Sequence, residues 1–400
     1  MIPVEDARAR IVAALEPVGT EVVPLAEALG RVLAAPVAAR RTQPPLDLSA
    51  MDGWAVRAAD LSIVPVALDI VGESVPGKGF SGLLGRGQAV RIFTGAPVPD
   101  GADAIAIQEN TSHDHDRVTV LESAAPGRYI RLAGLDFRRD EIVMEAPRRL
   151  SVRDVALLAA ADVAMVEVRR KPRIAVLATG DELTAPGSER GPAQIVDAAR
   201  PALLAFIERA GGIPVDLGIA RDNPDEIAEK AACGIEEDLL VTLGGASVSD
   251  RDLIARVLAD GGGGLDFWKI AMRPGKPLMF GRHCGVPLLG LPGNPVSALV
   301  CALLFLGPAL DRLSGLEPRP LAPIDVRLGA DVAANDRRED YLRARLAPGT
   351  DGVPVATPAP QQDSSQLRIL AEADVLIVRP PGAPALAAGA LVPAIPLDWF

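Results

Sequence analysis

Three polar, glycine-containing segments of this chain follow apolar runs that resemble β-strands. They are residues 179–182 (Thr-Gly-Asp-Glu), 244–252 (Gly-Gly-Ala-Ser-Val-Ser-Asp-Arg-Asp) and 292–297 (Pro-Gly-Asn-Pro-Val-Ser). Glycine lets a ligand approach the backbone, and the N–H groups at the start of a following helix attract anions. Each segment alone could simply cap a helix, with Asn294 as a cap and Pro295 at the first helical position. Three such segments, together with Asp222 in the loop after a further apolar run, favour one shared binding site.

A basic segment lies between the second and third of these turns. Residues 267–277 (Phe-Trp-Lys-Ile-Ala-Met-Arg-Pro-Gly-Lys-Pro) place three cations, Lys269, Arg273 and Lys276, within eight residues. One interpretation is a solvated basic loop. The other is a fixed loop that presents the Lys276 ammonium to a phosphate, because glycine and proline restrict the backbone around it. The residues alone do not choose between these interpretations.

Other candidate chemistry is weaker. Asp52 stands in an Asp-Gly pair, which is an ordinary hairpin signal. Residues 113–116 (His-Asp-His-Asp) could bind a metal, but alternating polar residues between two strands favour a solvated turn. No Ser-His-Asp or Cys-His pattern supports a nucleophilic hydrolase. Neither G-x-G-x-x-G nor G-x-x-x-x-G-K-[ST] follows a predicted strand, which argues against an unrelated nucleotide-binding enzyme.

Composition narrows the ligand class. The chain has 400 residues, 49% of them hydrophobic and 23% charged, which predicts two to three globular domains and excludes a disordered, collagenous or coiled-coil protein. The formal net charge of −11 argues against a nucleic-acid binder, which needs a basic face. An anionic ligand would therefore need a local basic cluster or metal ions.

The sequence also predicts that the chain carries no targeting signal. The three cysteines, Cys233, Cys284 and Cys301, are far apart, which favours a reducing compartment over a disulfide framework. The first residues carry charges where a signal peptide would be apolar. Residues 296–310 form an apolar run of about 15 residues, too short to span a bilayer, and predict a buried helix. We expect a cytoplasmic protein without a membrane partner.

The elements that must position the polar turns form an α/β pattern. Strands are predicted at 174–178, 215–219, 239–243 and 287–291, and helices at 200–210, 225–232 and 250–259. This alternation is typical of a doubly wound parallel sheet, whose ligands bind beyond the carboxyl ends of the strands. The first 40 residues show an amphipathic helical pattern, residues 42–132 read as a small β domain, and the region after 323 is again β-rich.

Seven segments together resemble one known family. They are residues 49–57, 91–109, 173–183, 216–224, 242–252, 267–277 and 289–297, in the family's order and over nearly the whole chain. The sequences SAMDGWAVR, RIAVLATGDEL and LGLPGNPVS are examples. The chain is similar to the molybdopterin molybdenumtransferases, which include the bacterial MoeA enzymes and the E domain of gephyrin.

The resemblance implies a multi-domain α/β plus β architecture. Residues 1–40 and 133–170 would form an elongated helical linker domain, and 41–132 an inserted β domain. Residues 171–322 would form a doubly wound α/β molybdopterin-binding domain, and 323–400 a C-terminal β-barrel-like domain. The family's homodimers place the active site between the α/β domain of one subunit and the β domain of the other.

The resemblance also implies a reaction. Molybdate is inserted into adenylylated molybdopterin and AMP is released, with Mg²⁺ as the cofactor and other molybdenum-cofactor biosynthesis proteins or acceptor molybdoenzymes as partners. The implied catalytic acids are Asp52, Asp136, Glu182, Asp222 and Asp252, of which Glu182, Asp222 and Asp252 would bind the metal. The implied substrate-binding residues are Thr94, Gly180, Asp181, Gly244, Gly245, Ser247, Lys269, Arg273, Lys276, Pro292, Asn294, Pro295 and Ser297.

The chain departs from the family pattern at four places. Ala199 replaces an Asn, Ser249 a Gly and Arg273 a Lys, and residues 361–365 (Gln-Gln-Asp-Ser-Ser) replace a Gly-Ser-Gly-like loop before Ser-Ser. These changes keep open a second function, that of a divergent paralogue that binds pterin or the molybdenum cofactor as a non-catalytic scaffold. The five retained acids favour the enzyme, because a pure binder does not need so much like charge in one site.

Overall fold

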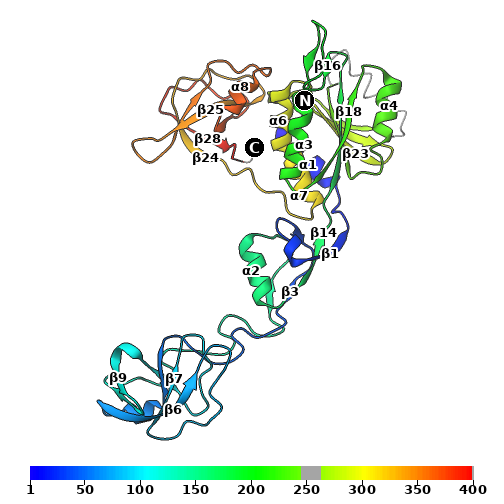
Figure 1. Cartoon of the computed structure of the whole chain (residues 1–400). Helices are drawn as coiled ribbons and strands as arrows, with labels where there is room; N and C mark the ends of the chain where they lie inside the picture. Colours follow the sequence, from blue (N-terminus) through cyan, green and yellow to red (C-terminus); the bar gives the residue numbers. More distant parts are fainter. Residues whose placement is uncertain (245–262, 399–400) are drawn as a thin grey trace.

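The computed structural model describes residues 1–244 and 263–398 and shows an elongated molecule (Figure 1). A β-rich unit lies at one end, and a narrow linker region connects it to an α/β domain at the other end. A second β unit, formed by the C-terminal part of the chain, lies beside the α/β domain. The predicted multi-domain architecture with α/β and β units is confirmed.

The α/β domain is built on a six-stranded sheet of order β18-β15-β19-β23-β22-β20. Its strands are β15 (Arg173–Thr179), β18 (Ile213–Ala220), β19 (Leu239–Leu243), β20 (Leu265–Trp268), β22 (Met279–His283) and β23 (Val286–Leu291). The first four in this order are parallel, as predicted, and the last two extend the sheet with antiparallel pairing. The short strands β16 (Leu183–Thr184) and β17 (Ile195–Val196) pair beside it.

Helices cover both faces of this sheet. They are α3 (Ala199–Arg209), α4 (Pro224–Ala232), α6 (Pro295–Cys301) and α7 (Gly307–Leu313), with the π-helical turn η4 (Ala302–Leu306) between the last two. Buried residues of α3, α6, η4 and α7 share one hydrophobic core with the sheet, and those of α4 belong to a core on the opposite face. The helix predicted at 250–259 lies outside the described residues.

The predicted buried helix is confirmed, and it is longer than the sequence indicated. The helix Pro295–Leu313 is continuous over 19 residues. Gly307 and Pro308, which follow the π-helical turn directly, do not end it. Within the described chain it is the one helix long and apolar enough to cross a membrane, with a mean hydropathy of 1.7. Its most apolar stretch is 94% buried inside the protein, as in a core helix.

The first 40 residues are α-helical only at their start. α1 (Val4–Ala13) buries Val4, Ala7 and Ile11 in the core of the α/β domain. The linker region that follows contains β1 (Thr20–Pro24), η1 (Leu25–Glu27), β2 (Val32–Leu33), β3 (Val37–Ala38), β12 (Ile142–Met144), β13 (Arg148–Arg149), α2 (Val152–Ala160) and β14 (Met165–Arg169). The expected helical linker is therefore mainly a four-stranded sheet, β1-β14-β2-β13, with one α-helix, because short β-branched runs pair across the returning chain.

The inserted β domain confirms the strands expected between residues 42 and 132. It contains β4 (Leu48–Ser49), β5 (Gly53–Val56), η2 (Ala58–Leu61), β6 (Val66–Ser74), β7 (Gln88–Ile92), β8 (Ala104–Ile107), η3 (Gln108–Asn110), β9 (Thr111–Asp114), β10 (Arg117–Val120) and β11 (Ile130–Arg131). The main sheet has the order β8-β5-β7-β6-β10-β9. His113 and Asp114 end β9, and His115 and Asp116 form the turn to β10; all four residues are exposed, in agreement with the solvated-turn interpretation.

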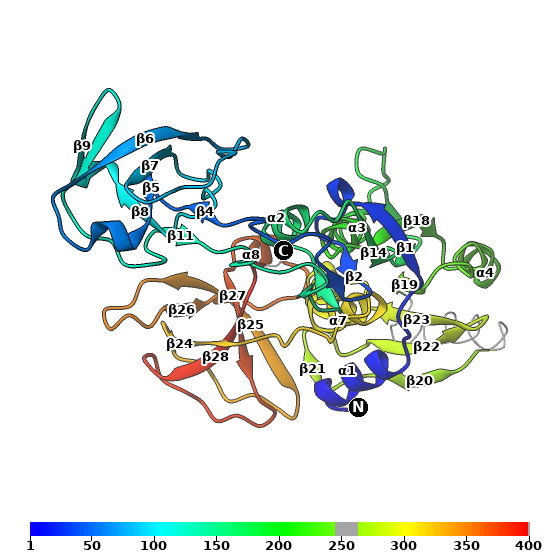
Figure 2. The ribbon, with the colours of Figure 1, turned by 90° about the horizontal axis from the view of Figure 1, so that it is seen from below.

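The C-terminal domain is a closed barrel beside the α/β domain (Figure 2). Its elements are β24 (Ile324–Leu328), β25 (Glu339–Ala347), β26 (Val355–Pro358), α8 (Leu367–Ala371), β27 (Val375–Arg379) and β28 (Leu391–Pro396). Pairing of β25 with β27 closes the ring. β21 (Met272–Arg273), which belongs to the α/β part of the chain, pairs in parallel with β25 and joins the two domains.

Candidate functional site

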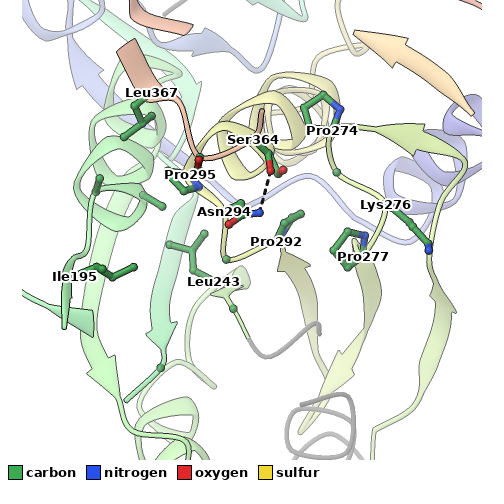
Figure 3. A pocket seen from close by; sticks show the side chains of 18 of the residues that line it. Ile195, Leu243, Pro274, Lys276, Pro277, Pro292, Asn294, Pro295, Ser364 and Leu367 are labelled. Carbon is green, nitrogen blue, oxygen red and sulfur yellow. Dashed lines mark hydrogen bonds between the residues drawn. The ribbon is translucent and has the colours of Figure 1, made fainter. Parts of the chain in front are cut away.

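A cavity of about 1030 Å³ opens at the carboxyl edge of the parallel strands (Figure 3). β15, β18, β19 and β23 all end at this edge, so the polar turns that follow them meet there, as predicted. The sequence-predicted residues that line the cavity are Gly180, Glu182, Asp222, Gly244, Lys269, Arg273, Lys276, Pro292, Asn294, Pro295 and Ser297. The structure therefore brings together most of the substrate-binding set.

The glycines are needed because the strand ends crowd one another. Gly244 has a φ of +89°, and a Cβ at this position would lie 2.6 Å from the carbonyl oxygen of Thr179. A Cβ on Gly293 would lie 3.3 Å from the Cα of Gly244. A side chain at Gly244 would push apart the two strands that form the floor of the cavity.

Asn294 does more than mark a helix start. It occupies the N-cap position of α6 with Pro295 directly after it, but its side chain makes no capping hydrogen bond. Instead, Nδ2 donates to Oγ of Ser364 over 2.9 Å, as the dashed line in Figure 3 marks, and both residues line the cavity. Asn294 thus connects the α/β domain to the C-terminal domain.

The basic segment is held in place and is not a free loop. Its first residues form β20 and its middle forms β21. The backbone N–H of Ile270 donates to the carbonyl of Lys276 over 3.0 Å. Gly275 has a φ of +119°, and a Cβ there would lie 2.6 Å from Sγ of the buried Cys301. The exposed Lys276 is therefore presented from a fixed backbone, which supports the phosphate-site interpretation.

The cations of the cavity wall differ in their partners. Arg273 is paired with Asp340, and Arg338 with Asp336. Nζ of Lys269 lies 3.7 Å from the centroid of the Trp268 ring, a cation–π contact. Across the described part of the chain neither Lys269 nor Lys276 forms an ion pair. Of the described cavity residues, these two ammonium groups are the cations left to attract an anionic ligand.

Sequence reasoning missed the contribution of the C-terminal domain. Arg338, Gln362, Asp363, Ser364, Ser365 and Leu367 line the cavity, as do Ile195, Val196 and Asp197 near α3. The sequence marks the segment 361–365 only as a departure from the family pattern. Its place in the wall depends on contacts between residues about 70 positions apart, such as the Asn294–Ser364 bond, which no local pattern reveals.

The buried side chain of Arg343 holds the loop 361–365 in place through hydrogen bonds. It is 1% exposed, its Nε donates to Oε1 of Gln362 over 3.0 Å, and its Nη1 donates to the carbonyl of Asp363 over 2.9 Å. Hydrogen bonds from Ser365 lower the pKa of the Asp363 carboxyl, and the Arg343 charge adds to this effect. The loop therefore presents an ionised carboxylate and two hydroxyl groups at the cavity.

Two of the three predicted metal-binding acids, Glu182 and Asp222, lie at the cavity. Glu182 and Asp222 follow neighbouring strands and line the cavity with exposed side chains. Asp181 does not line it; its carboxylate accepts a hydrogen bond from the backbone N–H of Asp222 over 3.2 Å and stabilises the turn. In residues 1–244 and 263–398 no group of three His, Cys, Asp or Glu residues could hold a metal ion. Glu182 and Asp222 nevertheless supply the carboxylate oxygens that Mg²⁺ prefers.

Three predicted residues, Gly245, Ser247 and Asp252, lie outside the described residues. The remaining three, Asp52, Thr94 and Asp136, lie in or next to the inserted β domain. Figure 1 places this domain at the opposite end of the molecule from the α/β domain. A single chain therefore does not bring these three residues to the cavity.

Asp52 and Thr94 form a preorganised pair within the inserted domain. The backbone N–H and the hydroxyl of Thr94 both donate to Oδ1 of Asp52, over 2.7 and 2.9 Å. These bonds, with the nearby charge of Arg91, lower the pKa of the Asp52 carboxyl. Arg91 is itself held by the Trp54 and Phe93 rings, 5.2 and 4.8 Å from its Cζ.

Asp136 is fixed through its backbone. Its N–H donates to the carbonyl of Gln43 over 3.0 Å, and its side chain is exposed. The carboxylate is therefore free to face solvent or a second protein chain, at the point where the linker region meets the inserted domain.

Comparisons with known proteins cover nearly the whole chain. Family profiles match at residues 2–161 (MoeA N-terminal region, domain I and II), 175–312 (probable molybdopterin binding domain) and 325–397 (MoeA C-terminal region, domain IV). A molybdopterin molybdenumtransferase of Nostoc sp. is 36% identical over 82% of this chain and 77% of its own length. Molybdopterin molybdenumtransferase 1 of Mycobacterium tuberculosis is 32% identical over 98% of each chain. A crystal structure of the molybdopterin biosynthesis MoeA protein from Pyrococcus horikoshii superposes with a TM-score of 0.85, at 30% identity over 99% of each chain.

Proposed function

Since this chain belongs to the molybdopterin molybdenumtransferase family, we propose that it inserts molybdate into adenylylated molybdopterin and releases AMP. The observation that carries the proposal is the large cavity at the carboxyl edge of the sheet. It combines three exposed carboxylates, those of Glu182, Asp222 and Asp363, with two ammonium groups that have no carboxylate partner among the described residues. Both substrates are anions, so they need the ammonium groups for binding. The carboxylates would repel them unless a cation lies between.

Each side of the cavity has a separate role in this proposal. Lys269 and Lys276 attract the phosphate and molybdate oxygens, while the wall formed by residues 362–365 limits where these oxygens can lie. Glu182 and Asp222, with Asp252, would hold Mg²⁺. Bound there, Mg²⁺ would offset the negative charge that develops on the departing AMP. The carboxylates thus serve the reaction through the metal and need not contact the anions directly.

We further propose that the active unit is a homodimer. Asp52, Thr94 and Asp136 lie in or next to the inserted β domain, at the far end of the molecule from the cavity, and hydrogen bonds within that domain order the Asp52–Thr94 pair. A second copy can place its inserted β domain against the cavity of the first. Each active site would then contain residues of both subunits, in a symmetric closed assembly.

The decisive experiment measures AMP release by the purified protein with adenylylated molybdopterin, molybdate and Mg²⁺. We expect AMP release that depends on both molybdate and Mg²⁺. Asp222→Asn should lose at least about a hundredfold in rate, because even the loss of a group that only supports a metal ligand typically costs 10–100-fold. The matched control is Asp225→Asn, which removes a carboxylate three residues further on, in the first turn of α4 and outside the cavity wall.

Two other outcomes would count against the enzyme. Binding of adenylylated molybdopterin without AMP release would favour the scaffold function. Absence of binding would contradict both functions. Complementation of a bacterial strain that lacks molybdenum insertion, with nitrate reductase activity as the readout, tests the same proposal in a cell.

A further inference from the structure

The resemblance assigns Arg273 to substrate binding, but most of its guanidinium group faces a protein partner. Nε lies 2.9 Å from Oδ1 of Asp340, and Nη2 donates to Oδ2 of the same carboxylate. Asp340 is 3% exposed, so it is held firmly by the barrel around it. Two of the three guanidinium nitrogens are thereby bonded across the boundary between the α/β domain and the C-terminal domain.

The pair lies where the barrel meets the cavity. Arg273 ends β21 and faces Asp340 in the parallel register of β21 with β25. The backbone N–H of Glu339 donates to the carbonyl of Ala271 over 2.8 Å and reinforces this junction. Arg338, directly before β25, lines the cavity. A shift of β25 relative to β21 would therefore move a part of the cavity wall.

We propose that Arg273 is a positioning residue that clamps the C-terminal domain onto the cavity through Asp340, while Lys269 and Lys276 make the cationic contacts to the substrates. The inference rests on the proposed function for the identity of those substrates. Arginine suits this task because its planar fork bonds the two carboxylate oxygens through two separate nitrogens, whereas lysine has one nitrogen and acts as a point charge. The family's usual lysine at this position lacks that fork.

The sign of one substitution separates a clamp from a direct anion ligand. In Asp340→Asn the fork loses its charged acceptor. If Arg273 contacted the substrate directly, releasing it from Asp340 would strengthen binding of adenylylated molybdopterin. A clamp predicts the opposite: the domain junction loosens, and the dissociation constant measured by calorimetry rises about fivefold to tenfold, a cost of about 1–1.4 kcal/mol by the usual conversion.

Arg273→Lys provides the second arm and keeps the positive charge. We expect the same weakening as in Asp340→Asn, and a double variant no weaker than either single variant, because both substitutions break one contact. The kcat of AMP release should stay within about twofold, since positioning of the wall affects binding more than the chemical step. Asp351→Asn is the matched control: it removes the carboxylate partner of Arg327 in the same domain, away from the cavity, and should leave the dissociation constant unchanged.

A structural readout keeps the inference independent of turnover. Amide hydrogen exchange at residues 338–342 should be faster in both clamp variants than in the wild type and unchanged in Asp351→Asn. Three results would each overturn the clamp. The first is a dissociation constant that falls or stays the same in Asp340→Asn. The others are a double variant that binds more weakly than either single variant, and unchanged amide exchange at residues 338–342. A wild-type protein that binds the pterin but releases no AMP would overturn the proposed function alone.

Discussion

Lysine and arginine have different tasks around the cavity, and the difference follows from their partners. Arg273 and Arg338 are bound to carboxylates of the C-terminal domain, whereas Lys269 and Lys276 are not paired with a carboxylate within the described chain. A compact ammonium on a flexible stem can follow an anion, while a guanidinium fork fixes two protein groups relative to each other. The sequence shows three cations within eight residues, but it does not show which of them pair with carboxylates.

Lys276→Ala should weaken binding of adenylylated molybdopterin about tenfold and change kcat by less than about twofold, because a contact made equally in the ground and transition states affects binding alone. Titration calorimetry and initial rates on one preparation separate the two effects. Lys230→Ala, on α4 and outside the cavity wall, is the control. Unchanged pterin affinity in Lys276→Ala would contradict its assignment.

The pKa of Asp52 provides a test in the inserted domain. In Thr94→Val the side-chain hydrogen bond is lost while the backbone bond remains, so the carboxyl pKa should rise toward its ordinary value. Because the folded-state pKa is lowered, this carboxylate stabilises the wild type at neutral pH, and the contribution disappears as the pH falls through that pKa.

Carbon NMR titration of the Asp52 carboxyl group measures the shift directly. Thr111→Val is the matched control, since the Thr111 hydroxyl donates to a backbone carbonyl and not to a carboxylate. The part of the stability difference between Thr94→Val and the wild type that comes from the Asp52 charge should be largest near neutral pH and should vanish in strong acid. An Asp52 pKa that stays the same in Thr94→Val would rule out the hydroxyl as a cause.

At the scale of elements, local sequence patterns correctly predicted the helices and strands whose formation depends on residues close together in the chain. The strands at 174–178, 215–219, 239–243 and 287–291 are confirmed to within a few residues, since buried parallel strands are continuous apolar runs. The helical pattern of the first 40 residues was wrong beyond Ala13, because a short amphipathic run does not show where pairing with a distant strand begins. β20 and β21 were hidden in a segment rich in glycine, proline and charge.

The residues of the candidate site also fall into a group that the sequence could place and a group that it could not. Turns that directly follow strands, such as those containing Glu182 and Asn294, could be placed at the cavity from the sequence. The loop 361–365 could not, because its position depends on Arg343 and on the Asn294–Ser364 bond. Long-range hydrogen bonds of this kind are specified by the packing of whole domains and not by periodicity.

Arg343→Lys should release this loop. A lysine keeps the charge but has one nitrogen in place of the two that bond Gln362 and Asp363, so at least one of these side-chain hydrogen bonds is lost. We expect the free energy of unfolding to fall by about 1–3 kcal/mol, the usual cost of such a loss, as measured by urea denaturation. Arg327→Lys removes a comparable set of bonds, to Asp351 and the Gly389 carbonyl, far from the cavity. Equal substrate affinities in the two variants would contradict a special role of Arg343.

At the scale of the molecule, the separation of the inserted β domain from the cavity leads to a subunit-mixing test. Asp52→Asn and Glu182→Gln should each be inactive alone. Equal mixing after reversible dissociation should restore about a quarter of wild-type activity, because about half of the dimers are mixed and each mixed dimer contains one intact site of two. Light scattering at micromolar concentration checks the dimer itself. Full activity of a monomer, or no recovery on mixing, would exclude shared sites.

The path of the chain through the linker has a further consequence. β1, β2, β3, β4 and β6 precede the exposed turn between β9 and β10, and they pair with β14, β13, β12, β11 and β10, which follow it. The returning chain thus retraces its outward path strand by strand. A protease that cleaves at His115 would produce two fragments that remain interlocked along the whole arm. They should elute together from a sizing column in native buffer and separate only in urea, so that a cut molecule keeps the shape of an intact one.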